Sequence, residues 1–302
     1  MYTKSHPEGR HPNSRPPTGT DASPKNLTAE YLLSLEDEDF ESYYIPNRYG
    51  FRHRETHATL IPCRFDDVDE FNCGLASVER QSKWGYIDHT GREVVPCTYD
   101  HALSFRENRG RVLKDGLCGF LDTDGKEVIP CIYEDADSFC EGRARVTHDF
   151  IHHGFITPDG KEAVPCIYEE VYAFSNGLAA VYADELWGFV NREGETTIPI
   201  SYEEVHSFSE GLAAVCDGQH WGFINDRNEL VIPYRYDETI AFCEGLAPVC
   251  QNGLWGYINH AGEIVVPCQY DFVYLYHEGQ AVVELGDEQF TIDTQGNRMA
   301  PA

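Results

Sequence analysis

Proline recurs at a nearly constant step along most of this 302-residue chain. Successive members of the series lie 34 residues apart, with one step of 35: Pro62, Pro96, Pro130, Pro165, Pro199, Pro233, Pro267 and Pro301. A tryptophan column stands twelve residues before the proline, a glycine follows it, and aromatic residues stand three and nine residues after the proline. A period of this length is typical of a tandem repeat. The repeat replaces the expectation of about two ordinary domains that the length alone would give.

The residues inside one repeat favour β-strands. Prolines recur within each unit, and the apolar runs are short and rich in Val, Ile, Tyr and Phe. In residues 246–268, Asn252-Gly253 predicts a tight hairpin turn, and the stretch from Asn259 to Gly262 predicts a type I turn closed by a left-handed glycine. We therefore predict seven three-stranded antiparallel meanders. The connectors between them, with apolar positions three apart, are predicted to form a 3₁₀ or single helical turn.

A single meander of this size cannot bury enough apolar surface to fold alone. Neighbouring units must therefore cover both of its faces, with their aromatic columns stacked. The glycine after tryptophan is expected to let the indole lie flat on a neighbouring backbone. A surplus hairpin precedes the first full meander, and the last meander finishes at Pro301. This placement of the repeats relative to the surplus hairpin favours an open, twisted all-β array, with a closed β-propeller as the alternative.

An open array needs covered ends. Residues 27–48 are expected to cap the first hairpin with a short helix whose N-cap is Thr28. Residues 49–302 then form the β domain, in which the motif decays toward the C-terminus. Residues 1–26 are polar and rich in proline, which predicts a disordered tail.

An acidic residue follows the tyrosine position of every connector. This acidic row comprises Asp66, Asp100, Glu134, Glu169, Glu203, Asp237 and Asp271. Each carboxylate is expected to accept backbone N–H groups of its connector turn. The functional alternative is an acidic stripe, with one carboxylate per stacked unit, that binds a basic partner.

One unit breaks the spacing, and it carries the candidate metal ligands. The 35-residue step lies within residues 147–154, where His153 stands in the tryptophan column. The preceding unit has Cys118 in that column, so stacking in register would bring Cys118 and His153 together, with His148 or His152 nearby. Such a set would suit zinc or copper. The alternative, which we favour, is a one-residue bulge filled by a weaker aromatic, with no metal or other cofactor.

Charge and cysteine content limit the cellular compartment and the binding partners that we expect. The chain has 51 Asp and Glu against 23 Lys and Arg, a net charge of −28, which argues against binding to nucleic acids or anionic membranes. It has no run of 18 apolar residues and no apolar signal segment at the N-terminus. Eleven cysteines, an odd number, are expected to be free thiols in a reducing cytoplasm, with export by a Sec-independent route as the alternative. Five of them directly follow the repeated proline and suit apolar packing: Cys63, Cys97, Cys131, Cys166 and Cys268.

Together these columns resemble the WG (or KWG) repeat found in many bacterial proteins. The stretch from Lys83 to Asp88, KWGYID, is closest to that motif, and Gly211 to Val215 matches its incoming strand. The resemblance covers residues 49–302, with departures at Cys118, His153 and Gln289 in the tryptophan column. It implies a binding or scaffold module, and no catalytic residue can be carried over from it.

The sequence therefore predicts a non-catalytic interaction module. Its partner is expected to be a basic protein, and an inhibitor or immunity-type factor is one concrete version of that role. The alternatives are a glycan-binding protein, and a metal-dependent enzyme with its site at the irregular unit. The oligomeric state stays open.

Overall fold

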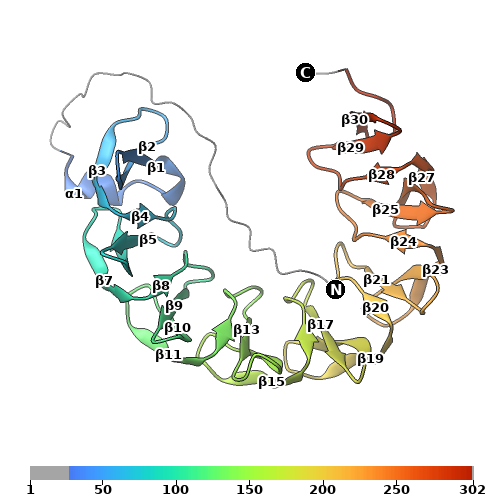
Figure 1. Cartoon of the computed structure of the whole chain (residues 1–302), viewed down its shortest axis with the longest axis horizontal. Coiled ribbons are helices and arrows are strands. Elements are labelled where there is room, and N and C mark those ends of the chain that lie inside the picture. The colour runs from blue at the N-terminus through green and yellow to red at the C-terminus, as the bar shows by residue number, and fades with distance from the viewer. Residues whose placement is uncertain (1–26, 301–302) are drawn as a thin grey trace.

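The computed structural model describes residues 27–300 as an open arc of small antiparallel β-sheets in chain order (Figure 1). Within these residues there are eight sheets: one of three strands at each end and six of four strands between them. Among the described strands, none of the first sheet pairs with one of the last. The predicted open all-β array is confirmed, and the arc does not close into a propeller. The tail predicted for 1–26, and Pro301, lie outside the described residues.

The three predicted strands are present in six of the seven repeats, whereas the last repeat has only the first two of them within the described residues. The second strands of the sheets are β5 (Leu75–Arg80), β9 (Gly110–Lys114), β13 (Ala144–Thr147), β17 (Leu178–Ala183), β21 (Ala213–Cys216), β25 (Leu246–Gln251) and β29 (Gln280–Leu285). The third strands are β6 (Lys83–Asp88), β10 (Leu117–Leu121), β14 (His153–Ile156), β18 (Leu186–Asn191), β22 (Trp221–Ile224), β26 (Leu254–Asn259) and β30 (Glu288–Asp293). The fourth strands lie on the convex side of the arc (Figure 1): β7 (Glu93–Tyr99), β11 (Glu127–Tyr133), β15 (Glu162–Tyr168), β19 (Thr196–Tyr202), β23 (Leu230–Tyr236) and β27 (Ile264–Tyr270).

The connector is a strand, so the prediction of a 3₁₀ or helical turn was wrong. Its first residues form the two-residue first strand of the next sheet: β4 (Asp67–Val68), β8 (His101–Ala102), β12 (Asp135–Ala136), β16 (Glu170–Val171), β20 (Glu204–Val205), β24 (Glu238–Thr239) and β28 (Phe272–Val273). In the first of these, Val68 pairs with Val78, and the N–H of Asp69 donates to the carbonyl of Ser77 at 3.0 Å. The connector's N–H groups are thus satisfied by the following long strand rather than by a helical turn.

Both predicted turn types are confirmed. Asn252 and Gly253 have φ of 55° and 77°, as a primed hairpin turn requires. In the other turn, Gly262 has φ of 76°, and its N–H donates to the carbonyl of Asn259 at 2.8 Å.

The glycine after tryptophan has a different purpose from the one predicted. Trp255 pairs with Tyr270 and Tyr257 pairs with Val266, so the fourth strand bulges opposite Gly256. A Cβ on Gly256 would lie 2.4 Å from the carbonyl oxygen of Val266. The glycine therefore makes room for the backbone of its own sheet at the proline bulge, not for an indole on a neighbouring sheet.

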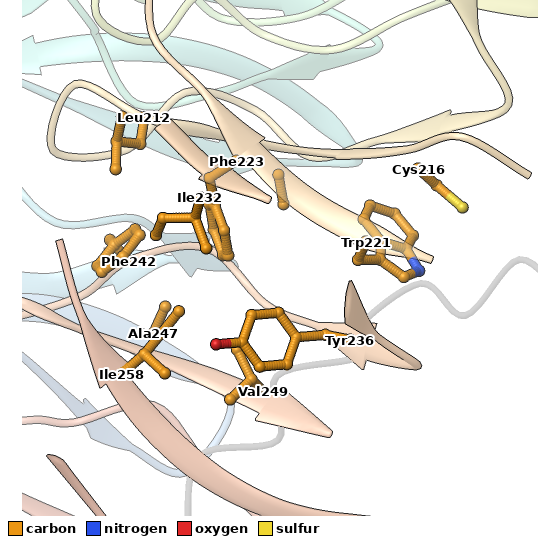
Figure 2. Close-up of a cluster of buried hydrophobic side chains, with 11 residues drawn as sticks. Leu212, Cys216, Trp221, Phe223, Ile232, Tyr236, Phe242, Ala247, Val249 and Ile258 are labelled. Atoms are coloured by element: carbon orange, nitrogen blue, oxygen red, sulfur yellow. The ribbon is translucent and has the colours of Figure 1, made fainter. Parts of the chain in front are cut away.

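Adjacent sheets share their aromatic cores, as predicted. In Figure 2, Phe223 and Tyr236 of one sheet lie in a cluster with Phe242, Val249 and Ile258 of the next. The aromatic ring two residues after the tryptophan column packs against the connector ring of the next sheet, with centroids 4.7–5.0 Å apart. These pairs are Phe51–Phe71, Tyr86–Phe105, Phe120–Phe139, Phe155–Phe174, Phe189–Phe208, Phe223–Phe242 and Tyr257–Tyr276. This ring pair, more than the tryptophan itself, joins one unit to the next.

The N-terminal end carries the predicted cap. Helix α1 (Ala29–Leu33) begins at Thr28, whose Oγ1 accepts a hydrogen bond from the N–H of Tyr31 at 3.2 Å. Its Leu32 is buried in the core of the first sheet. The cap continues through the 3₁₀ turn η1 (Asp37–Asp39), and the first sheet follows as β1 (Phe40–Ile45), β2 (Arg48–His53) and β3 (Thr59–Phe65). The β domain thus begins at Phe40, not at residue 49. Within residues 27–300, no helix has the length and apolar character needed to cross a membrane.

Candidate functional site

The acidic row lies at the corners where the chain passes from one sheet to the next. Asp100, for example, is the single residue between β7 and β8. Its Oδ2 accepts a hydrogen bond from the N–H of Asp115 at 2.7 Å, in the hairpin turn of the following sheet. Asp66, Asp237 and Asp271 accept equivalent bonds from the turns at Gln81, Gly253 and Gly286. These carboxylates accept backbone N–H groups as expected, but from the next hairpin rather than from their own connector.

The row differs between the two ends of the arc. Asp66 forms an ion pair with Arg48, and Asp100 forms one with Lys83. Hydrogen bonds from Lys83 and from the N–H of Asp115 lower the pKa of Asp100. From Glu134 onward, the described side chains of the row form no ion pair. These residues are Glu134, Glu169, Glu203, Asp237 and Asp271, and all except the half-buried Glu134 are exposed.

Charge is also unevenly divided along the chain. Residues 193–300 contain 18 Asp and Glu but only three basic residues, Arg227, Arg235 and Arg298. Of these, Arg235 donates to the carbonyl of Gly262 and lies over the Tyr236 ring, while Arg298 pairs with Glu288. The C-terminal sheets therefore present carboxylates with almost no cations to balance them.

A second row of acceptor side chains, four glutamates and one asparagine, links the sheets, and sequence reasoning missed it. Each member stands two residues after the connector aromatic and accepts N–H groups from the same turn of the next repeat. Glu141 accepts from Asn176 and Gly177 at 2.9 and 2.8 Å, and Glu244 accepts from Glu278 and Gly279 at 2.7 and 2.8 Å. We call this set the glutamate ladder: Glu107, Glu141, Asn176, Glu210 and Glu244, with Asp37 in the same role at the N-terminal cap.

The ladder residues adopt an unusual backbone conformation. The backbone φ lies between 49° and 52° at Glu107, Glu141, Glu210 and Glu244. Residues other than glycine and asparagine rarely adopt this region. Burial alone would raise the pKa of Glu141, but hydrogen bonds from Gly177 and Arg192 outweigh it and lower that pKa. The Phe-x-Glu-Gly spacing was visible in the sequence. It gave no sign that the glutamate turns back to bind the next unit.

The candidate metal ligands do not converge. Within residues 27–300, no three His, Cys, Asp or Glu side chains are placed to hold a metal ion. His152 Nδ1 lies 2.8 Å from Asp149 Oδ2, and the His148 ring packs on Tyr133 with centroids 4.8 Å apart. The extra residue is absorbed in the hairpin between β13 and β14, because Thr147 pairs with His153 across a five-residue turn.

Cys118 and His153 are instead contacted by arginines from neighbouring strands. Arg111 Nη2 lies 3.3 Å from Cys118 Sγ, and Arg145 Nη1 lies 3.1 Å from His153 Nδ1. Both guanidinium groups bind Asp135, at 3.1 and 2.8 Å. Burial alone would raise the pKa of Asp135, but the two arginines outweigh it and lower that pKa. The irregular units therefore hold a polar network where four of the other units hold an indole.

Comparison with known proteins agrees with the repeat seen in the fold. The family model for the WG containing repeat matches seven segments: residues 55–84, 84–118, 119–149, 154–187, 187–219, 221–255 and 255–288. A search of curated protein sequences gives no match.

Among solved structures, the chain is similar to one described as the eukaryotic initiation factor. The TM-score is 0.53 at 10% identity, and the match covers 87% of this chain and 85% of that one. It is also similar to BamB from Moraxella catarrhalis, with a TM-score of 0.40 at 11% identity, covering 86% and 93% of the two chains. At 10% identity, the likeness to the first of these structures bears on the fold alone. On the strength of the seven matched repeats, the chain belongs to the WG containing repeat family.

Proposed function

We propose that this chain is a non-catalytic scaffold that binds a basic protein through the acidic C-terminal half of its arc. The observation that carries the proposal is the charge imbalance of residues 193–300, with 18 acidic residues against three arginines. A surface of one sign attracts partners of opposite sign and speeds their association. Cations of a partner would there meet carboxylates most of which lack an intramolecular counterion.

The repeat places these carboxylates at regular intervals. Each corner of the C-terminal sheets presents an exposed acidic residue, and two of them present an acidic pair, Glu203-Glu204 and Asp237-Glu238. Because successive corners belong to successive sheets, a partner that contacts several of them gains from several weak attractions at once. Exposed ion pairs contribute only about 0.2–1 kcal/mol each, so the row matters as a set rather than residue by residue.

The same features weigh against the other functions that the sequence leaves open. The tryptophans Trp187, Trp221 and Trp255 are 7–8% exposed, so they support the core better than they would support a sugar-binding platform. The cysteine and histidines considered as metal ligands bind arginine, aspartate or tyrosine instead.

The test is affinity capture from native lysate at about 50 mM and about 300 mM salt, because the Debye length shortens over this range. We expect a defined set of basic proteins to be captured at low salt and lost at high salt. The triple variant Glu203→Gln/Glu204→Gln/Glu238→Gln should lose most of that capture. The matched control Glu70→Gln/Glu127→Gln/Glu162→Gln removes three exposed charges from the other half and should retain it. Capture that ignores salt, or that both triples reduce equally, would contradict the proposal.

A further inference from the structure

The last sheet of the arc, β28–β30, carries a pocket of about 600 Å³. Its lining includes Tyr274, His277, Gln280, Val282, Gln289 and Thr291, which come from β29, β30 and the connector that follows β28. Pockets that bind small groups commonly have volumes of about 300–1,000 Å³. This one therefore has room for one or two side chains of a partner.

The repeat shows what occupies the same place in another sheet. In the sheet β16–β19, the indole of Trp187 lies against the Tyr172 ring with centroids 4.7 Å apart. A shift of three repeats, 102 residues, carries Trp187 to Gln289 and Tyr172 to Tyr274. The same shift carries Phe189, which packs on the next sheet, to Thr291. The terminal sheet thus keeps the tyrosine but lacks both the indole that would cover it and the ring that packs on a following sheet.

The rim of the pocket is acidic. Glu284 accepts hydrogen bonds from the Tyr274 hydroxyl and from Gln289 Nε2, each at 3.2 Å. Glu278 continues the glutamate ladder in sequence, and among the described residues no turn of a further repeat donates to it. The one basic residue of this sheet, Arg298, is paired with Glu288. The pocket therefore combines an aromatic and aliphatic floor with carboxylates that have no cation beside them.

We propose that this pocket binds an aromatic side chain, flanked by arginine or lysine, from the basic partner. The ring would take the place that an indole holds in the sheets β16–β27, against Tyr274 and Val282. The flanking cations would lie beside Glu278 and Glu284. Aromatic residues and arginine are the usual anchors of protein interfaces, and arginine also binds over aromatic rings. This proposal rests on the proposed function and names the chemistry of its anchor.

A second copy of this chain fits the pocket less well. Each copy carries a net charge of −28, so an acidic rim would meet an acidic surface. A basic peptide instead gains from both the floor and the rim. Self-association therefore counts as an outcome against the proposal.

The experiment measures binding of the fluorescein-labelled peptide acetyl-Gly-Arg-Trp-Arg-Gly to the full chain by fluorescence anisotropy. The variant Gln289→Trp restores the repeat's own indole and should fill the pocket. The matched control Gln295→Trp adds the same residue at an exposed turn of the terminal sheet, outside the pocket lining. A second peptide with alanine in place of tryptophan isolates the contribution of the ring. Sedimentation of the free chain reports any self-association.

We expect Gln289→Trp to weaken peptide binding at least tenfold, Gln295→Trp to leave it unchanged, and the alanine peptide to bind at least tenfold more weakly. Hydrogen exchange of the unaltered chain should show added protection in β29 and β30 when the peptide binds, which keeps the test valid even if a variant misfolds. Equal binding by Gln289→Trp and the unaltered chain, equal binding of both peptides, or sedimentation as a dimer would overturn the proposal. If Gln289→Trp still captures basic lysate proteins in a salt-dependent way, the pocket is wrong while the proposed function stands.

Discussion

The sheets β8–β11 and β12–β15 keep the fold of the sheets β16–β27 without keeping its tryptophans. In the regular sheets, an indole is buried near a small second-strand residue, such as Ala180, which belongs to the same core cluster as Trp187. In the irregular sheets, the small residue is replaced by arginine and the tryptophan by cysteine or histidine. The space at the tryptophan column is therefore filled in both kinds of sheet. Residues from two neighbouring strands fill it together.

The two regions should differ most in how much the side chain at the tryptophan column contributes to the free energy of unfolding. Trp255→Ala removes an indole that is 7% exposed, and we expect the free energy of unfolding to fall by about 3–5 kcal/mol. Cys118→Ala, at the same column of an irregular sheet, should cost only about 1 kcal/mol. Urea unfolding followed by circular dichroism measures both. Equal losses would mean that the column has the same role in every sheet.

A double variant tests whether the arginine–histidine arrangement of an irregular sheet can be replaced by the tryptophan arrangement of a regular sheet. Arg145→Ala leaves Asp135, Asp137 and His153 without their shared cation and should cost about 2–4 kcal/mol. His153→Trp alone should also destabilise, because the indole would collide with the guanidinium. Combining both changes recreates the regular arrangement and should recover at least about 1 kcal/mol relative to the sum of the single losses. Strict additivity would show that the two strands are not coupled.

The glutamate ladder should act alike in both regions. Glu141→Ala in the irregular region and Glu244→Ala in the regular region each remove an acceptor of two backbone N–H groups, at an expected cost of about 1 kcal/mol. Glu244→Asn should be close to neutral, since Asn176 already serves in the ladder and asparagine tolerates positive φ. An asparagine variant as unstable as the alanine variant would argue against this explanation of the ladder.

The smallest expected difference is in pH dependence. Burial, and secondarily Arg145, lower the pKa of His153. The folded state therefore resists protonating it, and stability should fall as pH drops from about 7.5 to about 5.5, through the usual histidine range. His153→Gln should show a smaller fall, while exposed His220→Gln serves as the control. The pKa of Asp135 is also lowered, so protonation of its carboxylate should reduce stability in a more acidic range. A His153→Gln variant with an unchanged profile would contradict this interpretation.

The repeat period made most of the fold predictable. The turns at Asn252-Gly253 and Asn259–Gly262, the Thr28 cap and the stacking of sheets all follow from local residue chemistry. The two-residue first strands could not be predicted, because strands that short leave no alternating pattern. The purpose of Gly256 depends on a bulge in a strand ten residues away.

The candidate site was less predictable for a related reason. The acidic row was visible as a column, but its hydrogen bonds reach a turn about 15 residues further on. The glutamate ladder places glutamate at positive φ, against its ordinary preference, so its sequence resembles plain surface charge. Arg145 and His153 belong to two different columns of the repeat. In each column, the residue taken alone looks like an isolated departure from the motif.

The most direct measurement concerns the dependence of each sheet on its neighbours. Residues 204–236, which form β20–β23 in the full chain, can be produced alone and compared with residues 170–270, which form three consecutive sheets. We predict that the single sheet has the circular dichroism of an unfolded chain and no melting transition, and that the three-sheet segment shows β-structure and melts cooperatively. A single sheet that folded and melted cooperatively by itself would contradict the conclusion that these units are stable only when stacked.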